Sequence, residues 1–169
     1  MEINPSEYKI LIVDDVMSNV LLLKVLLTNE KFAIATANNG RQALEQVDKE
    51  HPDLVLLDVM MPDLSGFEVA QRLKSNPDTA DIPIIFLTAL NSTTDIVKGF
   101  QAGASDFISK PFNKEELIIR VTHQVSLVAA KRIILNKTEE LQRIIAGRDK
   151  LYSVIAHDLR SPMALSRWC

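Results

Sequence analysis

The sequence predicts an α/β fold built on a five-stranded parallel sheet with helices on both faces. Two observations lead to this prediction. Short apolar, β-branched segments alternate along the chain with longer amphipathic ones, and such alternation is typical of strands joined by crossover helices. Strand segments such as 84–87 are apolar at every position, which indicates burial from both sides of the sheet.

The breaks between the expected strands carry local signals for turns and helix starts. Asn39-Gly40 and the segment 102–104 mark turns. Ser65, Ser92 and Asn113 are each followed three positions later by an acidic residue, a pattern typical of a helix N-terminus. The predicted strands are Lys9–Val13, Phe32–Ala37, Leu54–Leu57, Ile82–Leu87 and Ala104–Ile108.

Beyond the last strand the chain changes character. From Lys114 almost to Pro162 it contains neither a strand pattern nor a proline, so we expect a single long helix there. A seven-residue repeat runs along it and predicts a coiled coil, and hence a homodimer formed through this C-terminal helix. The alternative is an amphipathic helix that folds back on its own domain. The repeat places Ile134, Leu141, Arg148 and Ile155 at one core position, and Thr138, Ile145, Tyr152 and Leu159 at the other.

Composition limits the possible classes of function. With 169 residues, of which 47% are hydrophobic and 24% charged, the chain can form one core and an appendage. A net charge of −3 argues against nucleic-acid binding, which needs a basic face. The single cysteine, Cys169, excludes a disulfide framework and favours a reducing, cytoplasmic setting. The most apolar late stretch, 117–135, is interrupted by polar and charged residues, so we expect no membrane segment.

Three carboxylates follow two of the predicted strands. Asp14 and Asp15 come directly after the first strand, and Asp58 directly after the third. Two unit charges about 4 Å apart repel by ~4 kcal/mol at an effective dielectric of about 20. Such a cluster needs a cation, or one acid that keeps its proton. Hard oxygen ligands suit Mg²⁺, and a divalent metal beside a reactive carboxylate suggests phosphoryl chemistry.

Two further groups, Thr88 and the pair Lys110-Pro111, also follow strands, and together with the acids they make the chain resemble a known family. Over roughly residues 9–125 it resembles the receiver domain of two-component response regulators. The resemblance implies a doubly wound, flavodoxin-like sheet of strand order 2-1-3-4-5. The segments that carry it are 10–15, 56–63, 87–89 and 103–111, in the order and spacing of the family.

The resemblance also implies roles for the acidic residues. Asp58 would be the phosphoacceptor that attacks a phosphoryl group in line. Asp15, Asp58 and the backbone carbonyl of Met60 would bind Mg²⁺, with Asp14 assisting through a water molecule. The phosphoryl donor would be a histidine kinase or a phosphotransfer protein.

Other roles follow from the same resemblance. Lys110 would place a positive charge on a phosphoryl oxygen, and Thr88 would donate a hydroxyl hydrogen bond to it. Phe107 occupies the family's aromatic switch position, where the ring moves inward as the threonine turns to the phosphoryl group; an ordinary core phenylalanine is the alternative. The Lys110-Pro111 bond is expected to be cis.

A second resemblance begins near the C-terminus. The segment 155–162 resembles the phosphoacceptor-histidine segment of sensor histidine kinases, and His157 would be its phosphorylated residue, facing away from the helical seam. We therefore expect a receiver domain over 1–125 and a truncated kinase dimerisation helix over 126–169. The parent protein would be a receiver-led histidine kinase, although this chain has no ATP-binding motif. The alternative is a stand-alone phosphotransfer protein or phosphate sink.

Overall fold

The computed structural model describes residues 3–89 and 93–159 of the chain, with side chains described as far as residue 148. The chain divides into two compact units, Met1–Val128 and Ala129–Cys169. No helix in the described ranges combines the length and the apolar character that a bilayer crossing requires.

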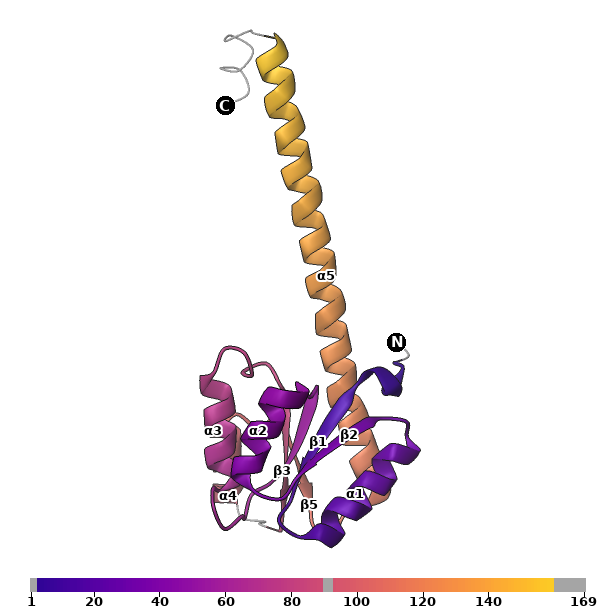
Figure 1. Cartoon of the computed structure of the whole chain (residues 1–169), viewed down its shortest axis with the longest axis vertical. Helices are drawn as coiled ribbons and strands as arrows, with labels where there is room; N and C mark the ends of the chain where they lie inside the picture. Colours follow the sequence, from indigo (N-terminus) through magenta and orange to yellow (C-terminus); the bar gives the residue numbers. More distant parts are fainter. Residues whose placement is uncertain (1–2, 90–92, 160–169) are drawn as a thin grey trace. The chain divides into compact units, whose positions relative to one another are not determined.

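The first unit contains a five-stranded parallel sheet of order β2-β1-β3-β4-β5 (Figure 1). This order confirms the predicted doubly wound topology. All four neighbouring pairs are parallel; Ile12 of β1 is the register partner of Leu56, and Leu56 is the partner of Ile85. The strands are β1 (Lys9–Val13), β2 (Ala33–Ala37), β3 (Leu54–Asp58), β4 (Ile84–Thr88) and β5 (Asp106–Ser109).

The strand ends differ from the predicted ones for identifiable reasons. β4 begins after Pro83 rather than at Ile82, because proline has no N–H with which to join the ladder. The carbonyl of Pro83 still accepts a hydrogen bond from the Val55 amide at 3.1 Å. At the other end, Asp58 and Thr88 are the last residues of their strands instead of lying just beyond them.

The helices begin largely where the capping signals indicate. Ser65 caps α3 by accepting a hydrogen bond from the Glu68 amide at 3.2 Å. Asn113 caps α5 by accepting one from the Glu116 amide at 3.1 Å. Asn39, expected in a turn, instead caps α2. The predicted cap at Ser92 lies outside the described residues. The helices are η1 (Pro5–Glu7), α1 (Met17–Asn29), α2 (Gly40–Glu50), α3 (Gly66–Ser75), α4 (Thr93–Gln101) and α5 (Lys114–Leu159).

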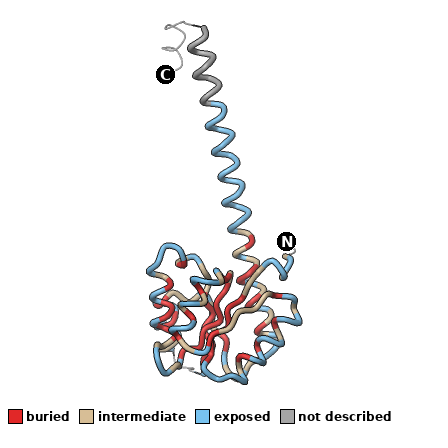
Figure 2. The backbone as a smooth tube through the Cα atoms, viewed as in Figure 1, coloured by how far each residue is buried: buried red, intermediate tan, exposed pale blue. Residues whose placement is uncertain are grey.

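Side-chain alternation along the strands builds two apolar layers, one on each face of the sheet. In β1, Leu11 and Val13 contribute to the cluster that packs against α2 and α3. Ile10 and Ile12 contribute to the cluster against α1 and the first turns of α5. The central strands β1, β3 and β4 are consequently buried from both sides (Figure 2), whereas the edge strands β2 and β5 are only partly buried. Burial of each such aliphatic side chain stabilises the fold by about 1.5–3 kcal/mol.

The long helix α5 has two differently buried parts. Leu117, Val121 and Val125 lie in the core of the first unit, whereas every residue from 131 to 148 is exposed (Figure 2). The exposed part carries large apolar side chains at Ile133, Ile134, Leu135, Leu141, Ile144 and Ile145. Of the predicted seam, the side chains of Tyr152, Ile155 and Leu159 lie outside the described residues.

Candidate functional site

The sheet brings the three predicted acids together at the carboxyl ends of β1 and β3. Asp14 extends the ladder beyond β1, because its amide donates to the Ala37 carbonyl at 3.3 Å. Carboxylate oxygens of Asp14, Asp15 and Asp58 lie within 4.8 Å of one another. Asp14 is 0% and Asp58 3% exposed, whereas Asp15 faces solvent. The sequence-based prediction of a carboxylate cluster at this edge is therefore met in the structure.

Lys110 supplies a positive charge inside the cluster. Its Nζ lies 3.1 Å from Asp14 Oδ2 and 3.1 Å from Asp58 Oδ1. Burial lowers the pKa of this ammonium group, but its hydrogen bonds to Asp14 and Asp58 outweigh that effect and the pKa is raised overall. The Lys110-Pro111 peptide bond is cis, as predicted. The Lys110 amide donates to the Thr88 carbonyl at 2.9 Å, which ties this residue to the end of β4.

Asp58 has an elevated pKa in this environment. Burial is the largest cause and the charge of Asp14 the second; Lys110 acts in the opposite direction, and the result is a pKa of about 6. A hydrogen bond with Asp15 contributes to the increase. Both expected solutions to charge crowding therefore operate here, since a cation sits between two acids and one acid holds its proton more tightly than usual.

Asp14 is held by groups that the sequence did not single out. Its Oδ1 accepts a hydrogen bond from the Val16 amide at 2.9 Å, and its Oδ2 accepts one from the Asn19 side-chain amide at 3.2 Å. Asn19 lies one turn into α1, so its closeness to Asp14 follows from helix geometry. No local pattern marked it, because Ser18 beside it is also polar. These contacts leave Asp14 well placed to orient Lys110.

Three further residues were predicted to belong to the site: Thr88, Met60 and His157. Thr88 is buried at the end of β4, two strands from β1. The amide of Met60 donates to Asp58 Oδ1 at 3.4 Å, so the chain turns back toward the acid at that residue. His157 lies within α5, and its side chain is outside the described part of the chain.

Comparison with known proteins decides the family. The model of the response regulator receiver domain matches residues 10–122. The chain belongs to the response regulator receiver family. Receiver domains accept phosphoryl groups from histidine kinases or phosphotransfer proteins, and this receiver domain has the corresponding acidic cluster at the expected edge of its sheet.

Individual relatives support the assignment. The response regulator PleD of Caulobacter vibrioides is 42% identical over 140 residues, which cover 83% of this chain and 30% of PleD. The chain thus spans less than a third of the length of that relative. A solved receiver domain of a signal transduction histidine kinase from Syntrophus aciditrophicus has 35% identity and a TM-score of 0.66, covering 70% of this chain and 90% of that one.

A further structural relative bears on the acidic cluster. The receiver domain of a sensor histidine kinase from Pseudomonas aeruginosa, described with a magnesium ion in its active-site cleft, has 26% identity and a TM-score of 0.66; the match covers 70% of this chain and 98% of that one. In the present receiver domain the donor set consists of carboxylate oxygens, two of them on buried acids. Such hard oxygen donors fit a magnesium ion.

Asp63 of the β3–α3 loop and Gly66, the first residue of α3, fix the backbone that follows Asp58 in this receiver domain. Asp63 caps α2, because its carboxylate accepts hydrogen bonds from the amides of Gly40 at 3.1 Å and Arg41 at 3.0 Å. The Gly66 amide donates to the Val59 carbonyl at 2.9 Å. A Cβ atom on Gly66 would overlap the Asp58 carbonyl oxygen and lie 2.9 Å from the Val59 Cα. Gly66 therefore allows α3 to start directly against the backbone of Asp58.

Replacement of Gly66 by alanine should displace the Asp58 backbone, because the atoms that the new methyl group meets are main-chain atoms that cannot rotate away. We expect a loss of about 2–3 kcal/mol in the free energy of unfolding and slower phosphorylation of the chain. Urea denaturation measures the first effect. Gly147→Ala is the matched control, since a Cβ there meets nothing within 4 Å; equal stability of the two variants would contradict the packing argument.

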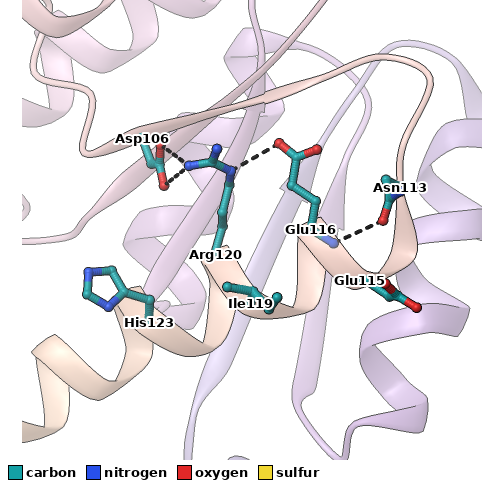
Figure 3. A pocket seen from close by; sticks show the side chains of 7 residues that line it. All are labelled: Asp106, Asn113, Glu115, Glu116, Ile119, Arg120 and His123. Carbon is teal, nitrogen blue, oxygen red and sulfur yellow. Dashed lines mark hydrogen bonds and ion pairs between the residues drawn. The ribbon is translucent and has the colours of Figure 1, made fainter.

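A surface pocket on the β5–α5 side of the receiver domain shares no lining residue with the acidic cluster (Figure 3). Arg120 dominates it, donating to both carboxylate oxygens of Asp106 at 2.8 Å and to Glu116 at 3.0 Å. The pair with Asp106 fastens α5 to β5, whereas Glu116 lies one turn before Arg120 in α5 itself. None of the seven lining residues belongs to the acidic cluster; they are Asp106, Asn113, Glu115, Glu116, Ile119, Arg120 and His123.

Proposed function

We propose that this chain is the phosphoacceptor module of a two-component phosphorelay, in which Asp58 receives a phosphoryl group from a phosphohistidine. The convergence of Asp14, Asp58 and Lys110 at one sheet edge carries the proposal. A carboxylate oxygen of Asp58 attacks phosphorus in line with the P–N bond of the donor. A P–O bond forms, and the P–N bond breaks with its electron pair returning to the imidazole nitrogen. The product is an aspartyl phosphate.

The residues around Asp58 prepare it for this attack. Lys110 already contacts Asp58 Oδ1, so a small movement of its flexible chain lets the ammonium follow the charge onto a phosphoryl oxygen. Thr88, buried at the end of the next strand, would supply a hydroxyl donor to another phosphoryl oxygen. Asp14 holds Lys110 between the two acids and thereby keeps the cation in place before the donor arrives.

The proposed metal is Mg²⁺. Asp15, Asp58 and the backbone carbonyl of Met60 would hold it, with Asp14 acting through a water molecule. When bound, it would offset negative charge on the attacking carboxylate and on the phosphoryl oxygens. The mutual proximity of the three carboxylates within 4.8 Å supports this assignment.

Labelling with a small phosphodonor tests the proposed function directly. The full chain, incubated with acetyl phosphate and Mg²⁺, should gain one acid-stable, base-labile phosphoryl group that intact-mass spectrometry detects. Removal of Mg²⁺ with EDTA should abolish the gain. Asp78→Asn, at an exposed acid outside the cluster, is the matched control and should label like the wild type. Metal-independent labelling, or labelling that maps to another residue, would contradict the proposal.

We further propose that residues 126–169 form a dimerisation helix and that a longer parent protein of this kind is a receiver-led histidine kinase with His157 as its phosphorylated histidine. The support is the exposed apolar seam of α5 and the resemblance of 155–162 to the kinase segment.

The proposed setting is cytoplasmic, with no nucleic-acid partner, on the grounds of the single cysteine and the net charge of −3. Transfer of label from His157 to Asp58, lost in His157→Gln, would instead support a phosphate shuttle.

Substitution in the seam tests the homodimer. Leu141 is 58% and Ile133 48% exposed, but only Leu141 occupies a predicted core position. Leu141→Lys should weaken dimerisation by at least about 1,000-fold, because each of the two copies loses burial of a leucine, about 2–3 kcal/mol per copy and about 4–6 kcal/mol for the dimer. Ile133→Lys, of matched chemistry, should leave it nearly unchanged. Sedimentation of the full chain over a range of concentrations measures both; a wild type that remains monomeric throughout would refute the dimer.

A further inference from the structure

Gly99 of α4 lies where the ring of Phe107 needs space. A Cβ atom built on Gly99 would overlap Cζ of that ring, lie 2.8 Å from its Cε1 and approach Cδ2 of Phe86 to 3.3 Å. Gly99 is buried. Glycine weakens a helix relative to alanine, and the presence of Gly99 in the last turn of α4 is accounted for by the ring that occupies the vacant Cβ position.

The ring of Phe107 lies between a buried and an exposed neighbour. Its centroid is 5.7 Å from that of Phe86, which is fully buried, and 4.9 Å from that of Phe100, which is 50% exposed. Phe86 in turn packs edge-on against Phe67 of α3 at 5.2 Å. Because the core side is filled by rings, a Phe107 side chain that is pushed off Gly99 can only rotate toward the surface.

Phe107 is also connected to the acidic cluster through the backbone. It is the register partner of Phe86 in β4, and Ser109 is the partner of Thr88. One residue further, the Lys110 amide donates to the Thr88 carbonyl, and the Lys110 ammonium group contacts Asp14 and Asp58. The short segment from Phe107 to Lys110 thus carries the ring at one end and the cation of the site at the other.

We propose that Gly99 is a positioning residue: its missing side chain forms a seat that holds Phe107 against Phe86 before any phosphoryl transfer and thereby couples the surface of α4 to the Asp58 site. The seat itself depends only on the packing of α4 and β5. Its coupling to Asp58 rests on the proposed function. Gly99→Ala should expel the ring and weaken the binding of a phosphoryl mimic, because the segment that carries the ring also carries Lys110, which contacts Asp58 and would contact the mimic.

The position of the ring can be measured without any phosphoryl chemistry. The full chain is prepared with 2-fluorophenylalanine at position 107, which carries its fluorine away from Cζ, and the solvent isotope shift of its ¹⁹F resonance reports exposure of the ring. Gly99→Ala should move the resonance to that of an exposed ring. Gly147→Ala, where a new Cβ meets nothing within 4 Å, should leave it unchanged. An unshifted resonance in folded Gly99→Ala would overturn the seat.

A double-mutant cycle covers the case in which Gly99→Ala folds poorly. If the clash with the ring is the cause, the same substitution made in Phe107→Ala should cost much less stability and leave mimic affinity unchanged. An equal loss in both backgrounds would overturn the proposal.

The coupling is tested by titrating beryllofluoride into the chain with Mg²⁺. Gly99→Ala should bind it at least about fivefold more weakly than the wild type, the lower end of ordinary coupling between sites. Equal affinity in the two, with the ring displaced, would overturn the coupling and keep the seat. A wild type that fails to bind beryllofluoride would instead refute the proposed function, and the fluorine result would still stand.

Discussion

Asp58→Asn should abolish phosphorylation and, at neutral pH, stabilise the fold by about 1–2 kcal/mol. The pKa of Asp58 is raised to about 6, chiefly by burial and then by Asp14. Its ionisation in the folded chain therefore costs on the order of 2–3 kcal/mol above that pH, at ~1.4 kcal/mol for each pKa unit. Asparagine keeps the shape and removes the charge. The amide cannot replace the carboxylate as partner of Lys110, which reduces the net gain.

The pH dependence gives this prediction its sign. Because the folded pKa of Asp58 lies above the ordinary value of 3.8, the folded state binds more protons than the unfolded state between these two values. The contribution of Asp58 to stability therefore falls as the pH rises from about 4 to about 6 and is constant above that range. In Asp58→Asn this decline is absent, so the advantage of the variant over the wild type should vanish below about pH 4.

Urea denaturation in EDTA, followed by circular dichroism at several pH values, measures both effects. Asp78→Asn, at an exposed position, controls for the loss of one negative charge and should behave like the wild type. An Asp58→Asn variant that is less stable than the wild type at neutral pH would show that the carboxylate is not strained by its surroundings. A stability difference that does not change with pH would show the same.

Lys110→Ala should produce the opposite effect on stability. Its Nζ lies 3.1 Å from both Asp14 and Asp58, and its side chain is only 23% exposed. Removal leaves two buried carboxylates without their cation, and breaking a buried pair in this way costs about 3–5 kcal/mol; partial exposure here reduces the expected loss to about 2–3 kcal/mol. The transfer rate from acetyl phosphate should fall about 100-fold, comparable with the loss of one charge-stabilising donor elsewhere.

Metal affinity separates the role of Lys110 from a general loss of packing. With the ammonium absent, Mg²⁺ no longer competes with a positive charge for Asp14 and Asp58, so we expect about tenfold tighter binding. Isothermal titration measures this. Lys9→Ala is the control, because the ion pair of Lys9 with Glu50 at 2.6 Å is partly exposed on both sides, and ion pairs open to solvent contribute little to stability. Similar behaviour of the two lysine variants would contradict the assigned role.

Much of the fold was predictable because it follows from local periodicity. The alternation of apolar strands and amphipathic helices requires only that each segment bury one face or two. Capping by Ser65 and Asn113 likewise depends on neighbours three residues away. The strand ends were less predictable: Asn39 proved to be a helix cap, and β4 began only after Pro83. Such boundaries depend on which backbone amides find partners in the completed sheet.

The sequence predicted which acids belong to the site better than it predicted which side chains contact one another there. Parallel strands bring their carboxyl ends to one edge, so Asp14, Asp15 and Asp58 had to be neighbours once the topology was known. That Lys110, 52 residues from Asp58, contacts two acids at once depends on how β5 and the following loop lie beside β4. Asn19 and Asp63 escaped notice because neither carries a distinctive local pattern.

The sequence by itself determined the alternating architecture, the set of chemically active residues at the ends of the strands, and the apolar repeat of the long C-terminal helix. Only the tertiary structure decided that Lys110 bridges Asp14 and Asp58, that Gly66 abuts the Asp58 backbone, and that Gly99 makes room for Phe107. The physical reason is range. Periodicity and capping arise from interactions within a few residues. Charge pairs, and the space left by a missing Cβ, depend on atoms far apart in the sequence that the packed strands and helices bring close.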